Sequence, residues 1–249
     1  IINFSKDLGI YENPDELLSI SLGSAETTLL KLTSAYSVFL NGGKLVNPII
    51  IDRIQDSEGK TIFNNEKRKC TNCDQISYLS NDYPDVKNNH KQIFSPQTAF
   101  QMTSILEGVI ERGTGKKLRE LKLNIAGKTG TTNNNTDTWF IGYTSNLLIG
   151  VYIGADNPKP LGKYETGSKT ALPIFKEFIK AAVTKSEARP FKASEGIIMM
   201  VVDPKTGLKA KFSSKNTIIE VYKNQNVIDG KVQHTNNDRL DANNILKFY

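Results

Sequence analysis

Residues 123–133 read LNIAGKTGTTN. Two apolar residues, Ile125 and Ala126, lead into a run of Lys, Thr and Gly, and a turn-forming NNN follows it. Beyond the turn, residues 138–143 (TWFIGY) read as a second strand, so the pattern predicts an antiparallel pair. The short residues leave one strand edge uncluttered, and Lys128 places a cation beside it. Such an edge is suited to docking an extended peptide that ends in a carboxylate.

Patterns on both sides of this pair predict the rest of the fold. Residues 146–155 are rich in Leu, Ile and Val and predict a third strand. Apolar residues at helical spacing predict helices over residues 24–40, 96–110 and 173–183. Ser24 and Ser95 are the expected N-caps of the first two, and Pro96 suits a first helical position. The order helix, three antiparallel strands, helix is typical of an α+β fold, with an antiparallel sheet flanked by helices.

The remaining segments suggest one main domain with an insert and an appendage. Residues 45–54 and 61–63 are predicted to pair as strands, and the Asn-, Lys- and Asp-rich residues 64–92 are predicted to form a surface insert. After residue 185 the composition changes. We therefore expect a main unit over residues 1–185 and a small β-rich extension or tail over residues 186–249.

Composition excludes few function classes. At 249 residues the chain can bury a sizeable core. Its formal charge of +6 is modestly basic, but no long Arg/Lys run with interleaved aromatics appears, so we expect no nucleic-acid partner. No apolar run approaches the ~18 residues that a membrane helix needs. The chain starts at Ile1 and not at Met, so we expect a piece of a longer protein, whose targeting signals would lie elsewhere.

Two cysteines, Cys70 and Cys73, lie in the predicted insert. A structural zinc site needs about four ligands, and the sequence has no second cysteine pair. Either a local disulfide or two free thiols would fit, and we favour the disulfide. We expect neither a metal nor a cofactor.

The triplet Gly127-Lys128-Thr129 superficially resembles the end of a nucleotide-binding P-loop. That motif needs a glycine five residues before its second glycine, but position 122 is Lys122. Gly108 and Gly113 have the required gap, yet Thr114 stands where lysine should follow. The spacing excludes a P-loop.

The wider block resembles a different family. A Lys-Thr-Gly triplet also occurs in serine enzymes that handle penicillin and D-alanyl peptides. Here it continues through Thr131-Thr132-Asn133 and a polar turn into Asp137-Thr138-Trp139-Phe140, and the whole block resembles the transpeptidase domain of class A penicillin-binding proteins. The resemblance covers roughly residues 1–215, and it also includes Leu22–Ser24, the Cys-x-x-Cys of the insert, Gly162, Thr170–Pro173 and Asp203–Gly207.

The resemblance implies two further motifs, Ser-x-x-Lys for the nucleophile and Ser-x-Asn for proton transfer, both before Lys-Thr-Gly. The only Ser-x-x-Lys match, Ser57 to Lys60, contains a glycine and reads as a turn. The Ser-x-Asn match, Ser214 to Asn216, comes after Lys-Thr-Gly. We therefore expect the nucleophile to lie outside this chain, which would be the C-terminal portion of a penicillin-binding protein/serine β-lactamase fold.

The resemblance also implies roles for the residues of the block. Lys128, Thr129, Gly130 and Thr131 form the predicted catalytic set, with Lys128 guiding the substrate carboxylate and the Thr131 N–H serving an oxyanion hole. Thr129, Thr131, Thr132 and Asn133 are the predicted substrate-binding residues.

The expected activity is peptidoglycan cross-linking by D-Ala-D-Ala transpeptidation through a serine acyl-enzyme, with stem peptides and β-lactam antibiotics as partners. The alternatives are a D,D-carboxypeptidase or β-lactamase-like hydrolase, and a non-catalytic penicillin-binding or sensor module. The resemblance further implies an upstream glycosyltransferase domain, membrane anchoring through an N-terminal segment, cell-wall synthesis proteins as partners, and the periplasmic face of the bacterial inner membrane as location.

Overall fold

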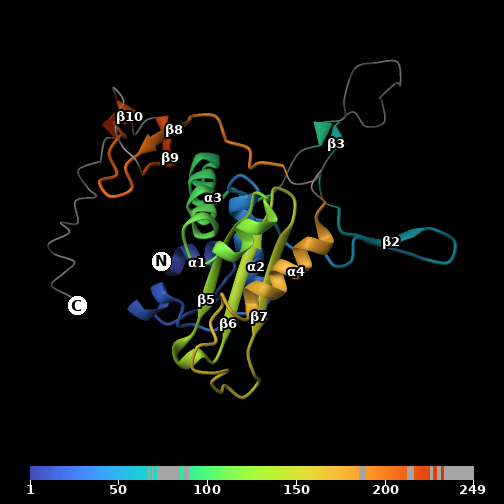
Figure 1. Cartoon of the computed structure of the whole chain (residues 1–249). Coiled ribbons are helices and arrows are strands. Elements are labelled where there is room, and N and C mark those ends of the chain that lie inside the picture. The colour runs from blue at the N-terminus through green and yellow to red at the C-terminus, as the bar shows by residue number, and fades with distance from the viewer. Residues whose placement is uncertain are drawn as a thin grey trace.

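The computed structural model describes residues 1–66, 68, 70–71, 85–86, 90–184, 189–211, 216–224, 227–228 and 231–232. A three-stranded antiparallel sheet lies at the centre of the molecule (Figure 1). Its strands are β5 (Ala126–Thr131), β6 (Thr138–Tyr143) and β7 (Leu148–Ile153), in that order. The register pairs Lys128 with Ile141 and Gly130 with Trp139. The predicted hairpin and third strand are confirmed, and among the described residues β5 has a strand partner on only one side.

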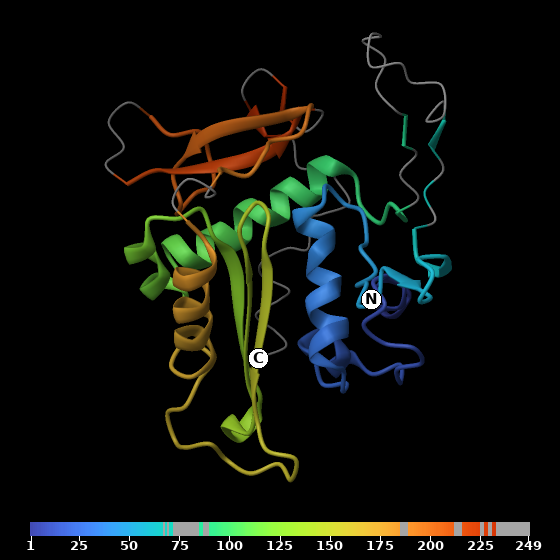
Figure 2. The same ribbon diagram turned by 90° about the vertical axis from the view of Figure 1, so that its right-hand side faces the viewer.

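Helices cover both faces of this sheet. Phe140 and Tyr143 are three residues apart on β6, so their side chains leave opposite faces. Phe140 packs against Phe175 of α4 (Ala171–Ala182), with ring centroids 4.7 Å apart. Tyr143 packs near Tyr36 of α2 (Leu29–Leu40). Figure 2 shows α2 and α4 on opposite sides of the strands, and the predicted α+β fold is confirmed.

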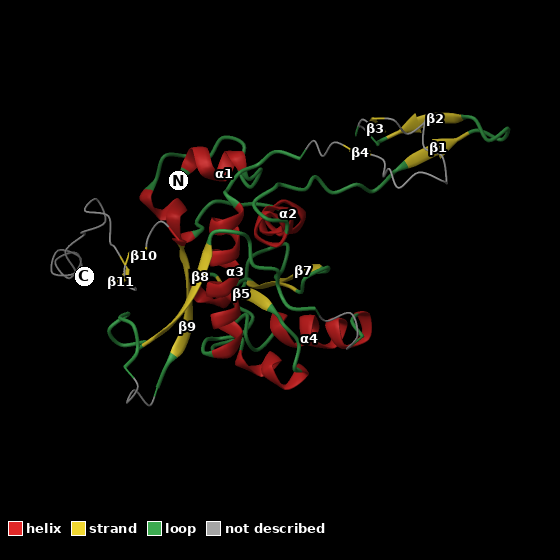
Figure 3. Cartoon of the chain, turned by 90° about the horizontal axis from the view of Figure 1, so that it is seen from above, coloured by secondary structure: helices red, strands yellow, loops and turns green. Residues whose placement is uncertain are grey.

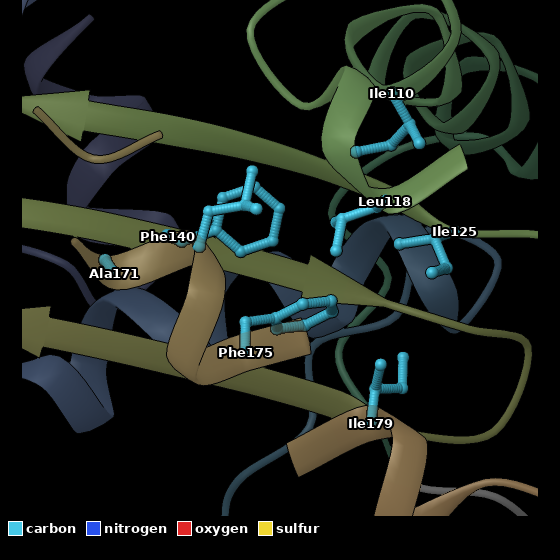
Figure 4. Packing of buried hydrophobic residues seen from close by; sticks show 8 residues of the cluster. Ile110, Leu118, Ile125, Phe140, Ala171, Phe175 and Ile179 are labelled. Carbon is cyan, nitrogen blue, oxygen red and sulfur yellow. The ribbon is translucent and has the colours of Figure 1, made fainter. Parts of the chain in front are cut away.

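The largest core cluster joins α4 to the sheet and to the end of α3 (Pro96–Glu111). Figure 4 shows Phe140 and Phe175 at its centre, with Ile110 and Leu118 at one end. Leu118 belongs to the 3-10 helix η3 (Lys116–Leu121), which follows α3. The cluster comprises Ile110, Leu118, Ile125, Phe140, Ala171, Leu172, Phe175 and Ile179, each at most 2% exposed. This packing fixes the end of α3 beside the start of β5.

Of the two predicted helix N-caps, one is confirmed and the other is wrong. The Ser95 hydroxyl accepts a hydrogen bond from the Thr98 N–H, and Pro96 occupies the first turn, as predicted. The first long helix begins at Leu29 and is capped by Thr28, so the prediction of Ser24 was wrong. The reason is that residues before Thr28 are tied to the N-terminal segment, where Thr27 Oγ1 donates to the carbonyl of Ile10 at 2.9 Å. This segment also contains α1 (Ile2–Asp7) and the 3-10 helix η1 (Leu18–Leu22).

A second correction concerns the predicted strand over residues 45–54. The strand β1 covers only Arg53–Gln55, and it pairs with β2 (Thr61–Asn64) in a hairpin that projects away from the sheet (Figure 3). The preceding residues 49–51 are exposed isoleucines. Leu45 instead donates its N–H to the carbonyl of Lys91, so the segment near it pairs with the return of the chain.

A two-stranded sheet of β8 (Ile197–Val202) and β9 (Ile218–Lys223) lies over α3 in Figure 2. The Gln101 side chain donates a hydrogen bond to the carbonyl of Val221 at 3.0 Å, and a guanidinium nitrogen of Arg112 lies 3.8 Å from a carboxylate oxygen of Glu220. Both strands lie in the segment for which a small β-rich extension was predicted. The division of the chain at that residue stays a prediction.

The described part of the insert is small. It contains β3 (Cys70–Thr71) and β4 (Asp85–Val86), which pair with each other. Most of the predicted insert, residues 64–92, lies outside the described residues. Cys70 is disulfide-bonded, whereas Cys73 lies outside the described residues. Two further short strands pair, β10 (Val227–Ile228) and β11 (Lys231–Val232). Over the described ranges, no helix has the length and apolar character needed to cross a membrane.

Candidate active site

The centre of the candidate site is the exposed Lys128 on the edge strand β5. Its Nζ donates a hydrogen bond to the Thr129 carbonyl oxygen at 2.8 Å. Because an ammonium group has three N–H donors, one such bond leaves capacity for an anionic ligand. The side chain is exposed while Ala126 and Gly127, which begin the same strand, are buried. The strand therefore runs from the core out to a solvent-facing cation.

Thr129 is paired with a residue that lies outside the Lys-Thr-Gly block. Its Oγ1 lies 2.8 Å from Oγ1 of Thr114, which comes just after α3. Both hydroxyls are at the surface. A hydroxyl can donate one hydrogen bond and accept two, so this pair keeps the capacity to donate to a ligand.

Thr131 is held by the loop that precedes α4. Its Oγ1 accepts a hydrogen bond from the Gly167 N–H at 3.1 Å. Gly167 sits so close to the hairpin that an added Cβ would lie 2.5 Å from the Trp139 carbonyl oxygen and 2.6 Å from that of Gly130. A backbone position this crowded admits only glycine. The loop thus clamps the end of β5 at the predicted site.

The Thr132 hydroxyl serves the turn between β5 and β6. It lies 2.7 Å from Thr136 Oγ1 and also accepts from the Asp137 N–H at 2.8 Å. The Asp137 carboxylate accepts from Tyr152 at 2.6 Å and from Thr136 at 2.9 Å. These bonds, led by the Tyr152 hydroxyl, lower the pKa of Asp137. The network fixes the turn, and Thr132 is part of that network.

Asn133 is exposed at the start of the 3-10 turn η4 (Asn133–Asn135). Its neighbour Asn135 ties the turn to a second loop, since its side-chain amide donates to the carbonyls of Gly162 and Lys163, both at 3.1 Å. Leu161 returns a backbone hydrogen bond to Asn135 at 2.9 Å. The rim that carries Asn133 is therefore fastened to the loop that leads to Gly167.

A half-buried carboxylate lies on α3, the helix that packs against β5. Burial, followed by the charge of Glu111, raises the pKa of Glu107 to about 7. The nearby Tyr143 is buried and shares a hydrogen bond with Thr103 at 3.0 Å. Burial raises the pKa of Tyr143, with a smaller upward contribution from Glu107. Glu107 therefore titrates near neutral pH in the folded protein.

Glu107→Gln is expected to change how thermal stability depends on pH. Because the pKa of Glu107 is higher in the folded state than in the unfolded state, the protonated carboxyl contributes to the free energy of unfolding. This contribution is fully present below the unfolded-state pKa of 4.5 and is lost as the pH rises through about 7. The variant should therefore melt at a higher temperature than the wild type at pH 8, and at nearly the same temperature at pH 5. Calorimetry at both pH values measures this, with exposed Glu58→Gln as the control. An equal gain at both pH values would contradict the assignment.

Of the two other serine motifs in the sequence, the one that the structure describes lies away from the site. Ser57 and Lys60 lie in the exposed turn between β1 and β2, where Asp56 accepts from the Lys60 N–H at 2.8 Å. Ser214 and Lys215 lie outside the described residues. Nor does any group of three or more His, Cys, Asp or Glu suited to a metal occur in the part of the chain that the structure describes.

The structure thus brings Lys128 to Thr131 together on one strand and adds partners that sequence reasoning missed. In the sequence Thr114 only breaks the P-loop pattern by standing where lysine would be needed, and Gly167 belongs to no motif. Asp137 lay within the recognised block, but its contact with Tyr152 depends on strand register. The arrangement is a cationic strand edge with adjacent hydroxyls and fixed rims, which can hold an extended chain by its carboxylate end.

A family model described as the penicillin binding protein transpeptidase domain matches residues 7–180. The chain belongs to this family. The match confirms the resemblance drawn from the Lys-Thr-Gly-Thr-Thr block. The matched residues include that block and the three strands of the central sheet.

Relatives of this penicillin-binding protein chain carry the same family name. Penicillin-binding protein 1A of Rickettsia prowazekii is 40% identical over 229 residues, which are 91% of this chain and 29% of that protein. Penicillin-binding protein 1A of Pseudomonas aeruginosa is 32% identical over an alignment 244 residues long, which covers 85% of this chain and 30% of the relative. The chain therefore spans about three tenths of the length of these curated relatives.

Solved structures agree with the fold. Penicillin-binding protein 1A from Haemophilus influenzae superposes with a TM-score of 0.73 at 29% identity, over 94% of this chain and 37% of that one. The penicillin V complex of PonA1 from Mycobacterium tuberculosis has a TM-score of 0.55 at 20% identity, over 76% of this chain and 50% of that one. The expected penicillin-binding protein fold is confirmed.

Proposed function

We propose that this chain supplies one edge of a serine D,D-transpeptidase active site that cross-links peptidoglycan. The observation that carries the proposal is the exposed Lys128 on edge strand β5, whose Nζ donates to the backbone carbonyl of Thr129, the next residue of the strand and one that also carries a hydroxyl. A D-Ala-D-Ala stem peptide ends in a carboxylate, which a lysine and adjacent hydroxyls can bind. The membership of the penicillin-binding transpeptidase family supports this substrate class.

In the proposed reaction the peptide lies along β5 with its terminal carboxylate at Lys128 and Thr129. Gly130 has no side chain, so the peptide can approach the strand backbone closely. The Thr131 N–H donates to the oxygen that becomes negatively charged when the scissile carbonyl is attacked. The clamp of Gly167 on Thr131 holds that donor in place, so no energy is spent on ordering it during the reaction.

The attacking serine and its Ser-x-x-Lys and Ser-x-Asn motifs are proposed to lie on residues outside this chain. Serine would attack the carbonyl and release D-alanine, and an amine of a neighbouring stem peptide would then displace the serine to form the cross-link. β-Lactams would react with the same serine, and a structure of the same fold was solved with penicillin V. The proposed location is the periplasmic face of the inner membrane, with anchoring by a segment outside this chain.

Labelling with fluorescent penicillin tests the proposal. We expect a covalent label on a protein that contains the complete transpeptidase domain, and none on the 249-residue chain alone. The label should withstand denaturing gel electrophoresis, and prior incubation with unlabelled penicillin should abolish it.

Three outcomes discriminate the alternatives. Strong labelling of this chain by itself would contradict the proposed position of the nucleophile. An intact, folded, complete domain that takes no label would favour a non-catalytic module. Release of D-alanine from a stem peptide without any cross-linked product, in the presence of an acceptor amine, would instead favour a D,D-carboxypeptidase.

A further inference from the structure

We propose that Thr114 is a positioning residue of the carboxylate subsite, which orients the Thr129 hydroxyl toward the substrate. The inference rests on the proposed function, because it assigns Thr129 to a peptide or β-lactam carboxylate. Thr114 lies outside the Lys-Thr-Gly block, 15 residues before Thr129 in the chain.

The geometry of the pair carries the argument. The two Oγ1 atoms are 2.8 Å apart, which is a normal distance for an O–H···O hydrogen bond. Only one of the two protons can lie between the oxygens. When Thr114 donates to Thr129, the Thr129 proton is directed elsewhere, and a bound anion is its strongest acceptor. Donation by Thr114 also polarises the Thr129 O–H and makes it a better donor.

Thr114 is held rigidly enough to act in this way. It lies between Gly113 and Gly115, whose N–H groups both donate to the carbonyl of Val109, at 3.1 Å and 3.0 Å. A Cβ on Gly113 would lie 2.9 Å from that carbonyl oxygen, and a Cβ on Gly115 would lie 2.6 Å from Ile110 Cδ1. The two glycines therefore let the turn fold closely onto the end of α3. The tightly folded turn presents the Thr114 hydroxyl to β5.

The pair is also accessible and has no evident structural purpose. Thr114 is exposed and Thr129 is half-buried, so a ligand carboxylate can reach both. An exposed hydroxyl pair of this kind adds little to the free energy of folding, because water replaces either partner readily. The Lys128 ammonium reaches over the strand to the Thr129 backbone carbonyl at 2.8 Å, so a carboxylate drawn to that cation arrives at Thr129.

The test compares a carboxylate ligand with the same ligand lacking the charge, on a protein with the complete transpeptidase domain. Thr114→Val keeps the side-chain shape and removes the hydroxyl. We expect it to slow acylation by benzylpenicillin about five- to tenfold, the loss of roughly one hydrogen bond, and to leave acylation by the methyl ester of benzylpenicillin unchanged. Thr114→Ser should stay within about twofold of the wild type for both compounds. Thr61→Val, on the projecting β2, is the matched control and should change neither rate.

A double-mutant cycle sharpens the result. In a Thr129→Val background, Thr114→Val should have no further effect on benzylpenicillin, because the hydroxyl that it orients is gone. An undiminished effect there, or an equal loss for the acid and the ester, would overturn the positioning role. An unchanged benzylpenicillin rate in Thr114→Val, with the wild type acylated normally, would also overturn it and leave the proposed function standing. A wild type that reacts with neither compound would overturn the proposed function and this inference together.

Discussion

Lys128→Ala is expected to slow acylation by benzylpenicillin roughly 100-fold or more, the scale that single preorganised electrostatic groups reach in acyl transfer. The lysine places a full positive charge on an exposed strand edge, where the substrate carboxylate is proposed to dock. The side chain is not part of the core, so the free energy of unfolding should change by less than about 0.5 kcal/mol. Stopped-flow acylation kinetics and thermal unfolding of the same preparations measure both quantities.

Two variants control this experiment. Lys117→Ala removes an exposed lysine from η3 and should leave acylation unchanged. Lys128→Arg keeps the charge but replaces a compact ammonium with a planar guanidinium, and it should recover only part of the rate. If Lys128→Ala instead unfolds the protein, the lysine has a structural role. If the variant is acylated at the wild-type rate, the lysine has no role in the reaction.

Gly167→Ala is expected to lower the free energy of unfolding by about 3 kcal/mol, the upper range for forcing a methyl group into a packed site. The new Cβ would lie 2.5 Å from one backbone oxygen and 2.6 Å from another, and neither belongs to a flexible side-chain end. Either the loop or the β5–β6 hairpin must move. Either shift would break the hydrogen bond from Gly167 to Thr131, so acylation should fall as well.

Gly108→Ala is the matched control for that prediction. A Cβ at Gly108 would meet only the end of the Arg112 side chain, which can move aside. Because alanine favours a helix interior over glycine by roughly 1 kcal/mol, this variant should be as stable as the wild type or more so. Chemical denaturation of both variants gives the comparison. Equal stability of Gly167→Ala and the wild type would show that the loop is not clamped.

The parts of the fold that the sequence predicted are those with strong local patterns. The three strands of the central sheet and the helix capped by Ser95 depend on turn residues, apolar spacing and a cap, all of which act over a few residues. Ser24 failed as a cap because tertiary contacts hold the residues after it in a different path. Likewise, the isoleucines at 49–51 have high strand propensity but no partner strand beside them in the described structure.

The residues of the candidate site likewise fall into those that a local sequence pattern predicts and those that it does not. Lys128 to Thr131 could be found because the motif is contiguous on one strand. Thr114 and Gly167 could not, since each reaches β5 from a different connection, after α3 and before α4 respectively. Their relation to the strand is set by the packing of the two helices against the sheet, and no spacing in the sequence encodes it. Partners contributed by separate elements are the part of a site that a motif search misses.

The register of the β5–β6 hairpin places a fluorescent side chain opposite the candidate site. Trp139 is the single tryptophan of the chain, and it stands directly opposite Gly130. Its ring lies 4.6 Å from that of Tyr152, between centroids. A peptide laid against Gly130 would alter the polarity around the indole or its contact with the tyrosine. We therefore expect the intrinsic emission of this chain to change when a peptide occupies β5, so that the neighbouring strand reports the binding without any attached dye.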